Sequence, residues 1–207
     1  MNFDFLTNDL PVSVHACGKE YPINWDFRTG IKLDGILRSD LEEADKMEQM
    51  LHLYYGEECI PPDIYQAVDR IVWFYRCGEL PDDEEEEKKK RRYARRKSKE
   101  PACVLTQDAP YVYAAFMDQY GIDLTGIETM HWWKFMSLFE SLGDGTKMSK
   151  IMYYRKASTA GMSKERRAFL NEMKKLYRIR STGRKKMTLQ QRNQNWKDYV
   201  KERFERG

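Results

Sequence analysis

The most apolar segment of the chain reads Met130-His131-Trp132-Trp133-Lys134-Phe135-Met136-Ser137-Leu138-Phe139-Glu140-Ser141-Leu142. Apolar residues fall on nearly every side of the 3.6-residue helical period, so a helix formed here has no face suited to water. We therefore expect this helix to be central to the C-terminal half of the protein. Thr125 and Glu128 form a capping-box pattern that predicts its beginning, and Gly143-Asp144-Gly145 closes it.

Amphipathic patterns predict more helices around this segment. Asp108 is a suitable N-cap for a helix from Pro110 to Tyr120, and Gly121 ends it. Apolar spacing predicts three further helices, at residues 149–156, 163–179 and 188–206. The last two are basic and amphipathic.

The N-terminal part predicts the only sheet. Apolar residues alternate from Val12 to Ile23 on either side of Cys17-Gly18-Lys19, a pattern typical of a β-hairpin. Two helices follow it. Ser39 and Glu42 form a capping-box pattern at the start of the first, which Gly56 ends.

The second of these helices begins after Pro61-Pro62-Asp63 and runs to Gly78. We expect its stripe of apolar residues to pack against the hairpin and the preceding helix. The apolar residues of that stripe are Ile64, Ala67, Val68, Ile71, Val72 and Tyr75. The sequence thus predicts a mainly α-helical fold made of helical bundle lobes, with a short N-terminal β-hairpin and a charged helical linker.

A charged segment divides the chain. Six acids at 82–87 precede nine bases within 88–99; the net charge of residues 1–87 is −14 and that of residues 88–207 is +17. Four Glu-to-Lys or Glu-to-Arg pairs at i, i+4 favour a solvated helix, although a plain linker has the same composition. We therefore expect four parts: an acidic lobe at 1–80, the linker at 81–104, a helical lobe at 105–180 and a basic tail helix at 181–207.

Catalytic and metal-binding patterns are absent from the sequence. The four cysteines, at 17, 59, 77 and 103, show no C-x-x-C spacing, and His15, His52 and His131 have no cysteine or second histidine at metal-site spacing. No phosphate-binding, nucleophile-elbow or zinc-protease motif occurs. We expect a non-enzymatic protein with no cofactor, no metal and no catalytic residues, and we expect His131 to be a hydrogen-bonded core residue.

Membrane insertion and export are not indicated by the sequence. The first ten residues carry Asp4 and Asp9 and no base, and the longest apolar run, Ile71 to Tyr75, is too short to cross a bilayer. We expect the protein to stay in the cytoplasm in which it is made.

The basic segment favours nucleic-acid binding as an alternative function, because positive charge alone supports nonspecific binding to phosphates. The adjoining acids compete for these same bases. The candidate phosphate-binding residues are Lys88, Lys89, Lys90, Arg91, Arg92, Arg95 and Arg96.

Several segments together resemble the bacteriophage "gene product fifteen" family of tailed phages and prophages of Gram-positive bacteria. The resemblance covers about residues 12 to 179, apart from the charged linker, and its ordered motifs are more specific than any one alone. These segments are residues 19–28 (KEYPINWDFR), 71–78 (IVWFYRCG), 108–116 (DAPYVYAAF), 120–124 (YGIDL), 131–135 (HWWKF), 150–155 (KIMYYR) and 173–177 (MKKLY).

The resemblance implies a tail morphogenesis protein, regarded as a tail assembly chaperone, that works in the host bacterial cytoplasm. Its partners would be the tape measure protein and the tail tube protein, and the charge asymmetry predicts possible self-association. A structural component retained in the virion is a further alternative. The aromatic and basic residues expected to contact a partner are Trp25, Phe27, Arg28, Trp132, Trp133 and Phe135.

Overall fold

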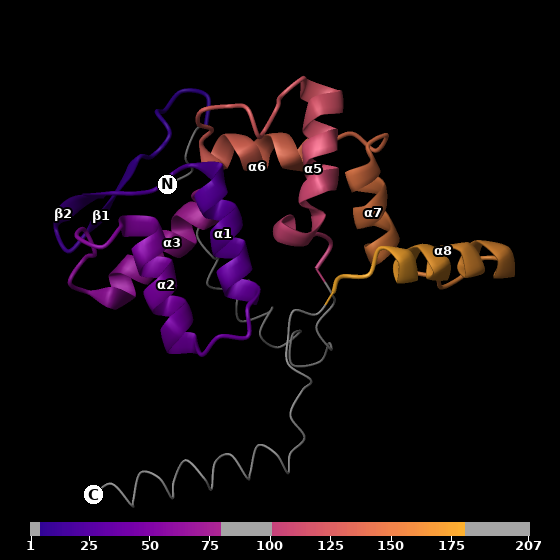
Figure 1. Cartoon of the computed structure of the whole chain (residues 1–207), viewed down its shortest axis with the longest axis horizontal. Helices are drawn as coiled ribbons and strands as arrows, with labels where there is room; N and C mark the ends of the chain where they lie inside the picture. The colour runs from indigo at the N-terminus through magenta and orange to yellow at the C-terminus, as the bar shows by residue number, and fades with distance from the viewer. Residues whose placement is uncertain (1–4, 80–100, 181–207) are drawn as a thin grey trace, which may run out of the picture.

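The computed structural model describes residues 5–79 and 101–180 (Figure 1). Seven helices and a two-stranded antiparallel hairpin make up these residues, which confirms the mainly α-helical prediction. The elements, labelled as in Figure 1, are β1 (Ser13–Ala16), β2 (Lys19–Pro22), α1 (Phe27–Arg38), α2 (Glu43–Tyr55), α3 (Ile64–Tyr75), α5 (Leu105–Tyr120), α6 (Trp132–Glu140), α7 (Lys147–Lys156) and α8 (Lys164–Leu176).

The hairpin forms where the alternating pattern predicts it. Ser13 pairs with Pro22 and Ala16 with Lys19, and the turn places Cys17 and Gly18 at φ +50° and +73°. Positive φ at both central residues matches the right-handed twist of the two strands. Val14 and Ala16 are buried, and the hairpin packs against α3.

Helix α1 is not predicted by the apolar pattern. Its N-cap is Asp26, whose side chain accepts a hydrogen bond from the backbone N–H of Arg28 at 2.9 Å. Gly30 and Gly35 lower the helix propensity of this segment, because glycine loses the most backbone entropy in a helix. Packing stabilises the helix instead, since α1 contacts α2, α5 and α6.

Both capping-box predictions are wrong. Ser39 ends α1 rather than beginning α2, because its hydroxyl donates to the carbonyl of Ile36 at 2.7 Å; the N-cap of α2 is Glu42. Thr125 donates from both its N–H and its hydroxyl to Asp123 in a turn, and α6 begins later, with His131 as its N-cap. In each case a nearer partner satisfies the side chain that the pattern assigned to the cap.

Helix α5 begins five residues earlier than predicted. Asp108 is not its N-cap; its carboxylate instead accepts a hydrogen bond from the N–H of Val104, which is the N-cap, at 2.9 Å. Pro110 then lies inside the helix, and Gly121 ends it at φ +66°, as predicted.

The beginnings of α3 and α8 agree with the pattern, whereas α7 begins at Lys147, two residues before the predicted position, with Thr146 as its N-cap. Asp63 caps α3 by accepting from the N–H groups of Tyr65 and Gln66, and Ser163 caps α8 by accepting from Arg166. The predicted charged helix at residues 82–99 and the basic tail helix at residues 188–206 lie outside the described residues, so the four-part division of the chain stays a prediction.

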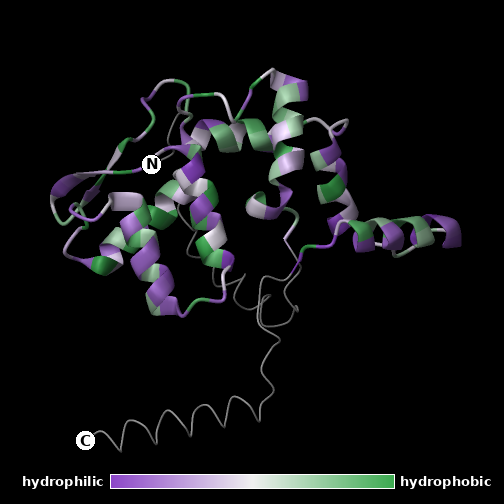
Figure 2. Ribbon diagram, viewed as in Figure 1, coloured by the Kyte–Doolittle hydropathy of each residue, from purple (hydrophilic) through white to green (hydrophobic). Residues whose placement is uncertain are grey.

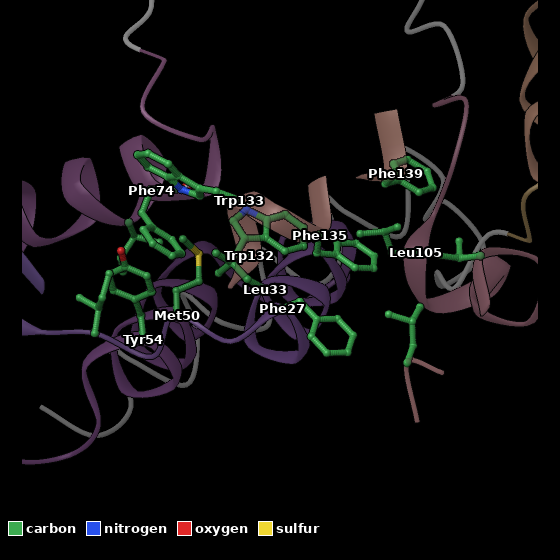
Figure 3. Close-up of a cluster of buried hydrophobic side chains, with 14 of the residues drawn as sticks. Phe27, Leu33, Met50, Tyr54, Phe74, Leu105, Trp132, Trp133, Phe135 and Phe139 are labelled. Atoms are coloured by element: carbon green, nitrogen blue, oxygen red, sulfur yellow. The ribbon is translucent and has the colours of Figure 1, made fainter. Parts of the chain in front are cut away.

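One hydrophobic core joins the segments before and after the charged stretch. Figure 3 shows buried side chains running from Tyr54 and Phe74, through Trp132 and Phe135, to Phe139 and Leu105. Phe135 of α6 stacks on Phe27 of α1, with ring centroids 5.1 Å apart. Helix α6 is thus the central element, as the sequence predicts, but it packs against both halves of the chain.

The two tryptophans that begin α6 bind the last turn of α3. The Trp132 indole N–H donates to the carbonyl of Tyr75 at 3.0 Å, and the Trp133 indole N–H donates to the carbonyl of Phe74 at 2.8 Å. The last carbonyls of a helix have no partner within the helix, and the Trp132 bond supplies a donor to the carbonyl of Tyr75. The carbonyl of Phe74 accepts a second hydrogen bond, from the N–H of Cys77 at 2.9 Å. The Trp132 ring also lies against Gly30 of α1, where a Cβ would overlap it.

Helices α7 and α8 extend from α5 at the far end of the described body (Figure 1). Arg155 of α7 forms a paired ion bridge to Asp108 of α5, with N–O distances of 2.6 and 2.8 Å, and both side chains are almost fully buried. The same guanidinium donates to the carbonyls of Tyr177 and Ala102. Arg155 therefore connects α5, α7 and the end of α8.

Candidate protein-binding site

Four of the six residues expected to contact a partner are buried. Phe27, Trp132, Trp133 and Phe135 expose 3% or less of their surface, and all four belong to the core around α6. An interface role for these four is therefore not supported, because a partner cannot reach them in this structure.

The other two residues, Trp25 and Arg28, bind the segment that leads into α6. The Trp25 ring stacks on His131 at 5.7 Å, and the Trp25 carbonyl accepts from the N–H of Trp132 at 2.9 Å. Arg28 donates to the carbonyl of Ile127 at 2.8 Å. Both side chains are half-buried and hold the two halves of the chain together.

His131 is a hydrogen-bonded core residue, as expected. Its Nδ1 accepts from the N–H of Trp133, so Nε2 carries the proton and donates to the carbonyl of Pro11 at 2.9 Å. Burial lowers the pKa of this imidazole, and the hydrogen bond to Pro11 opposes that shift only in part. These two hydrogen bonds, one accepted and one donated, are those of a neutral imidazole.

Two of the four cysteine thiols, those of Cys77 and Cys103, do not show the environment of reactive groups. Burial raises the pKa of Cys77 and of Cys103 to about 12, with carboxylates nearby adding to the shift. A thiol with so high a pKa is protonated at neutral pH and is a poor nucleophile or metal ligand. Among residues 5–79 and 101–180, no group of three or more His, Cys, Asp and Glu side chains could hold a metal ion.

A groove between α1 and α2 is the candidate protein-binding site. It is open to solvent and has a volume of about 680 Å³. Apolar atoms of Ile36, Leu41 and Leu53 contribute to its walls, and Leu41 is 38% exposed. The other lining residues are Lys32, Gly35, Ser39, Glu48, Gln49 and His52.

The segment that contains α2, on one side of the groove, is acidic. Residues 39–58, which contain α2 and the loops at its two ends, carry seven carboxylates and one lysine, for a net charge of −6. Figure 2 shows the hydrophilic residues of α2 in purple beside apolar ones in green. The lining itself has one acid, Glu48, and one lysine, Lys32, so the negative charge lies mainly in the residues around the groove. An apolar channel in such a region suits an amphipathic helix that carries basic residues next to an apolar stripe.

Sequence reasoning missed this groove because it did not predict α1, which forms one wall. Leu41 falls within the helix that the sequence predicts between Ser39 and Gly56, yet it precedes α2 and is exposed. The signal that could have found the groove is Asp26, an N-cap residue followed by apolar residues at 27, 31, 33, 36 and 37.

The candidate phosphate-binding residues, Lys88 to Arg96, lie outside the described residues, so nucleic-acid binding by this segment stays a prediction. No helix among the described residues is both long and apolar enough to span a membrane.

Comparison with known proteins gives one family match. A family model described as Bacteriophage Gp15 protein matches residues 6–179, and the chain therefore belongs to that family. No curated protein and no solved structure matches the chain. The segments that carry the family resemblance include the HWWKF and WFYRCG motifs, which meet in the core where α6 binds the end of α3.

Proposed function

We propose that this member of the bacteriophage Gp15 protein family is a non-enzymatic tail assembly chaperone, which holds an apolar helical stretch of the tape measure protein in the α1–α2 groove. The groove is the observation that carries the proposal. Ile36, Leu41 and Leu53 present apolar surface there, in a channel that is open to solvent. A tape measure protein is a long helical chain whose apolar stripes are exposed until the tail tube closes around it. A groove that accepts such a stripe would keep the chain soluble in the host cytoplasm.

The acidic region around the groove supports a reversible complex. Charged groups around an apolar channel mainly set the rate and selectivity of binding, so the tail tube protein could later displace the chaperone without breaking a large interface. The proposal therefore includes the tail tube protein as the second partner.

Co-expression with the tape measure protein of the same genome tests this function. We expect the tape measure protein to be soluble only alongside this chain, and to be retained with it in a pull-down. The variant Leu41→Glu places a charge in the groove and is expected to lose both effects. Met117→Glu on α5 is the matched control, since Met117 is 41% exposed and Leu41 38%. Equal solubilisation by both variants would exclude the groove as the client site.

Nucleic-acid binding is the second candidate function, and the charge of one region favours it. Residues 147–180, which contain α7 and α8, carry eleven bases and two acids. A DNA affinity that falls steeply with salt, and falls further when Lys88, Lys89 and Lys90 are neutralised, would support this function. The third alternative is that the protein is a structural component retained in the virion. Mass spectrometry of purified particles tests it, because a chaperone should be absent from them.

A further inference from the structure

Helix α8 is the least buried helix of the described structure. Leu170 is its one buried residue, while Phe169 is 49% and Leu176 is 65% exposed. These two residues are seven positions apart, so they lie on the same side of the helix, two turns from each other. Its main packing contact is with α7, and this contact includes the rings of Phe169 and Tyr154, whose centroids are 6.0 Å apart.

The charge of this region is opposite to that of the rest of the described protein. Residues 147–180 have a net charge of +9, whereas residues 5–79 and 101–146 together have a net charge of −12. On α8 itself, Arg166, Arg167 and Lys175 are exposed. The helix thus presents an apolar pair, Phe169 and Leu176, in a region of net positive charge. Arg166 lies near this pair, and the two acids of the helix, Glu165 and Glu172, flank it.

We infer that α8 of one copy docks in the α1–α2 groove of a second copy of this chain. The groove offers apolar walls in a region of net charge −6, and α8 offers the exposed apolar pair in a region of net charge +9. The groove and α8 lie toward opposite ends of the described body, so the contact forms between copies (Figure 1). A dimer formed in this way keeps one free groove and one free α8. Further copies can therefore join it head to tail.

This inference deepens the proposed function. The docking between copies does not depend on that function, but the competition with the client does. The second copy and the client use the same groove, so the two compete. Before the client is made, α8 of each copy covers the apolar groove of the next copy. An apolar stripe of the tape measure protein then displaces α8 from the groove, which releases single copies onto the client.

The docked surface is small, because α8 has 13 residues and a length of about 20 Å. Contacts of this size are weak, and a contact between opposite charges at the surface weakens further with salt. Self-association should therefore be reversible, dependent on protein concentration and lost at high salt.

Sedimentation of the full chain at about 50 mM and about 500 mM salt tests the inference. We expect the mass to rise with protein concentration at low salt and to equal that of the monomer at high salt. Leu176→Glu on α8 and Leu41→Glu in the groove are each expected to give monomers at low salt. Met117→Glu should associate like the unchanged chain.

Mixing the two monomeric variants gives the sharpest test. The Leu176→Glu chain keeps its groove, and the Leu41→Glu chain keeps its α8, so the mixture should form a dimer that grows no further. A monomeric wild-type chain at low salt, a Leu176→Glu variant that associates normally, or a mixture that stays monomeric would each overturn the inference. Association that disappears after nuclease treatment would also overturn it, because nucleic acid would then bridge the copies.

The client assay separates this inference from the proposed function. Leu176→Glu should still solubilise the tape measure protein, since its groove is unchanged. If it does so while the wild-type chain never self-associates, only the inference fails. If the copies associate as described but no chain holds the tape measure protein, only the chaperone function fails.

Discussion

Helices α6 and α8 both carry apolar residues but use them differently. In α6, Trp132, Trp133, Phe135 and Phe139 are all buried, whereas α8 buries only Leu170. The motif by which the chain resembles its family is therefore part of the core. The surfaces available to partners lie elsewhere, in the α1–α2 groove and on α8. The conspicuous aromatic motif thus belongs to the core, while the exposed apolar residues indicate where contacts can form.

The largest effect is expected from Trp132→Ala. This change removes a fully buried ring, the hydrogen bond to the carbonyl of Tyr75 and the contact with Gly30. Large aromatic-to-alanine changes in a core cost about 3–5 kcal/mol, and we expect the upper part of that range. Denaturant unfolding followed by circular dichroism measures the loss.

Tyr65→Ala is the control for this prediction, because Tyr65 is 83% exposed. Its free energy of unfolding should stay within about 0.5 kcal/mol of the unchanged chain. Similar losses in the two variants would contradict the central position of α6.

Arg155→Met should cost about 3 kcal/mol, because it leaves the Asp108 carboxylate buried without its partner. Burial alone would raise the pKa of Asp108, but the hydrogen bonds from Arg155 and from the N–H of Val104 outweigh it, and the pKa is lowered. The stabilisation by this pair is present above the ordinary carboxyl pKa and is lost as the pH falls through the lowered value. Unfolding measured from pH 7 to pH 2 should show a larger loss in the unchanged chain than in Arg155→Met.

The double variant Asp108→Leu with Arg155→Met checks the reason for that loss. It removes both charges together, so it should recover much of the stability that Arg155→Met loses. A double variant no more stable than the single one would show that the hydrogen bonds from Arg155 to the carbonyls of Ala102 and Tyr177 matter more than the ion pair.

Local signals in the sequence predicted the hairpin and α3. The hairpin follows from Gly18 and the alternating residues around it, and α3 follows from Asp63 and its stripe. Helices α1 and α6 also have caps from adjacent residues, Asp26 and His131, but they depend in addition on contacts between distant residues. For example, the N–H of Phe27 donates to the carbonyl of Met130, about a hundred positions away in the chain. Spacing within one segment contains no information about such a partner.

The candidate site shows the same limit. Whether Leu41 lies in a core or in an open groove depends on α1, which packing stabilises against low local propensity. The sequence did predict His131 as a hydrogen-bonded core residue, because the apolar residues around it are its neighbours along the same helix.

His131 should give a smaller, pH-dependent effect. Because burial lowers its pKa, the unfolded chain binds a proton more readily than the folded one. Stability is therefore complete above the ordinary histidine pKa of about 6.5 and falls as the pH drops below it. Thermal unfolding between pH 5 and pH 8 should show this slope in the unchanged chain and a weaker one in His131→Asn. His15→Asn, at an exposed position, should keep the slope.

The smallest effect on stability is expected from Leu176→Ala on α8. Leu176 is 65% exposed, so its removal should change the free energy of unfolding by less than about 0.5 kcal/mol at high salt, where copies are separate. At low salt the same change should weaken self-association, because it removes half of the exposed apolar pair. Leu170→Ala, on the buried side of α8, should do the reverse and lower stability by about 2 kcal/mol or more. If Leu176→Ala destabilised the monomer as much as Leu170→Ala, α8 would have no free face, and its difference from α6 would be one of degree.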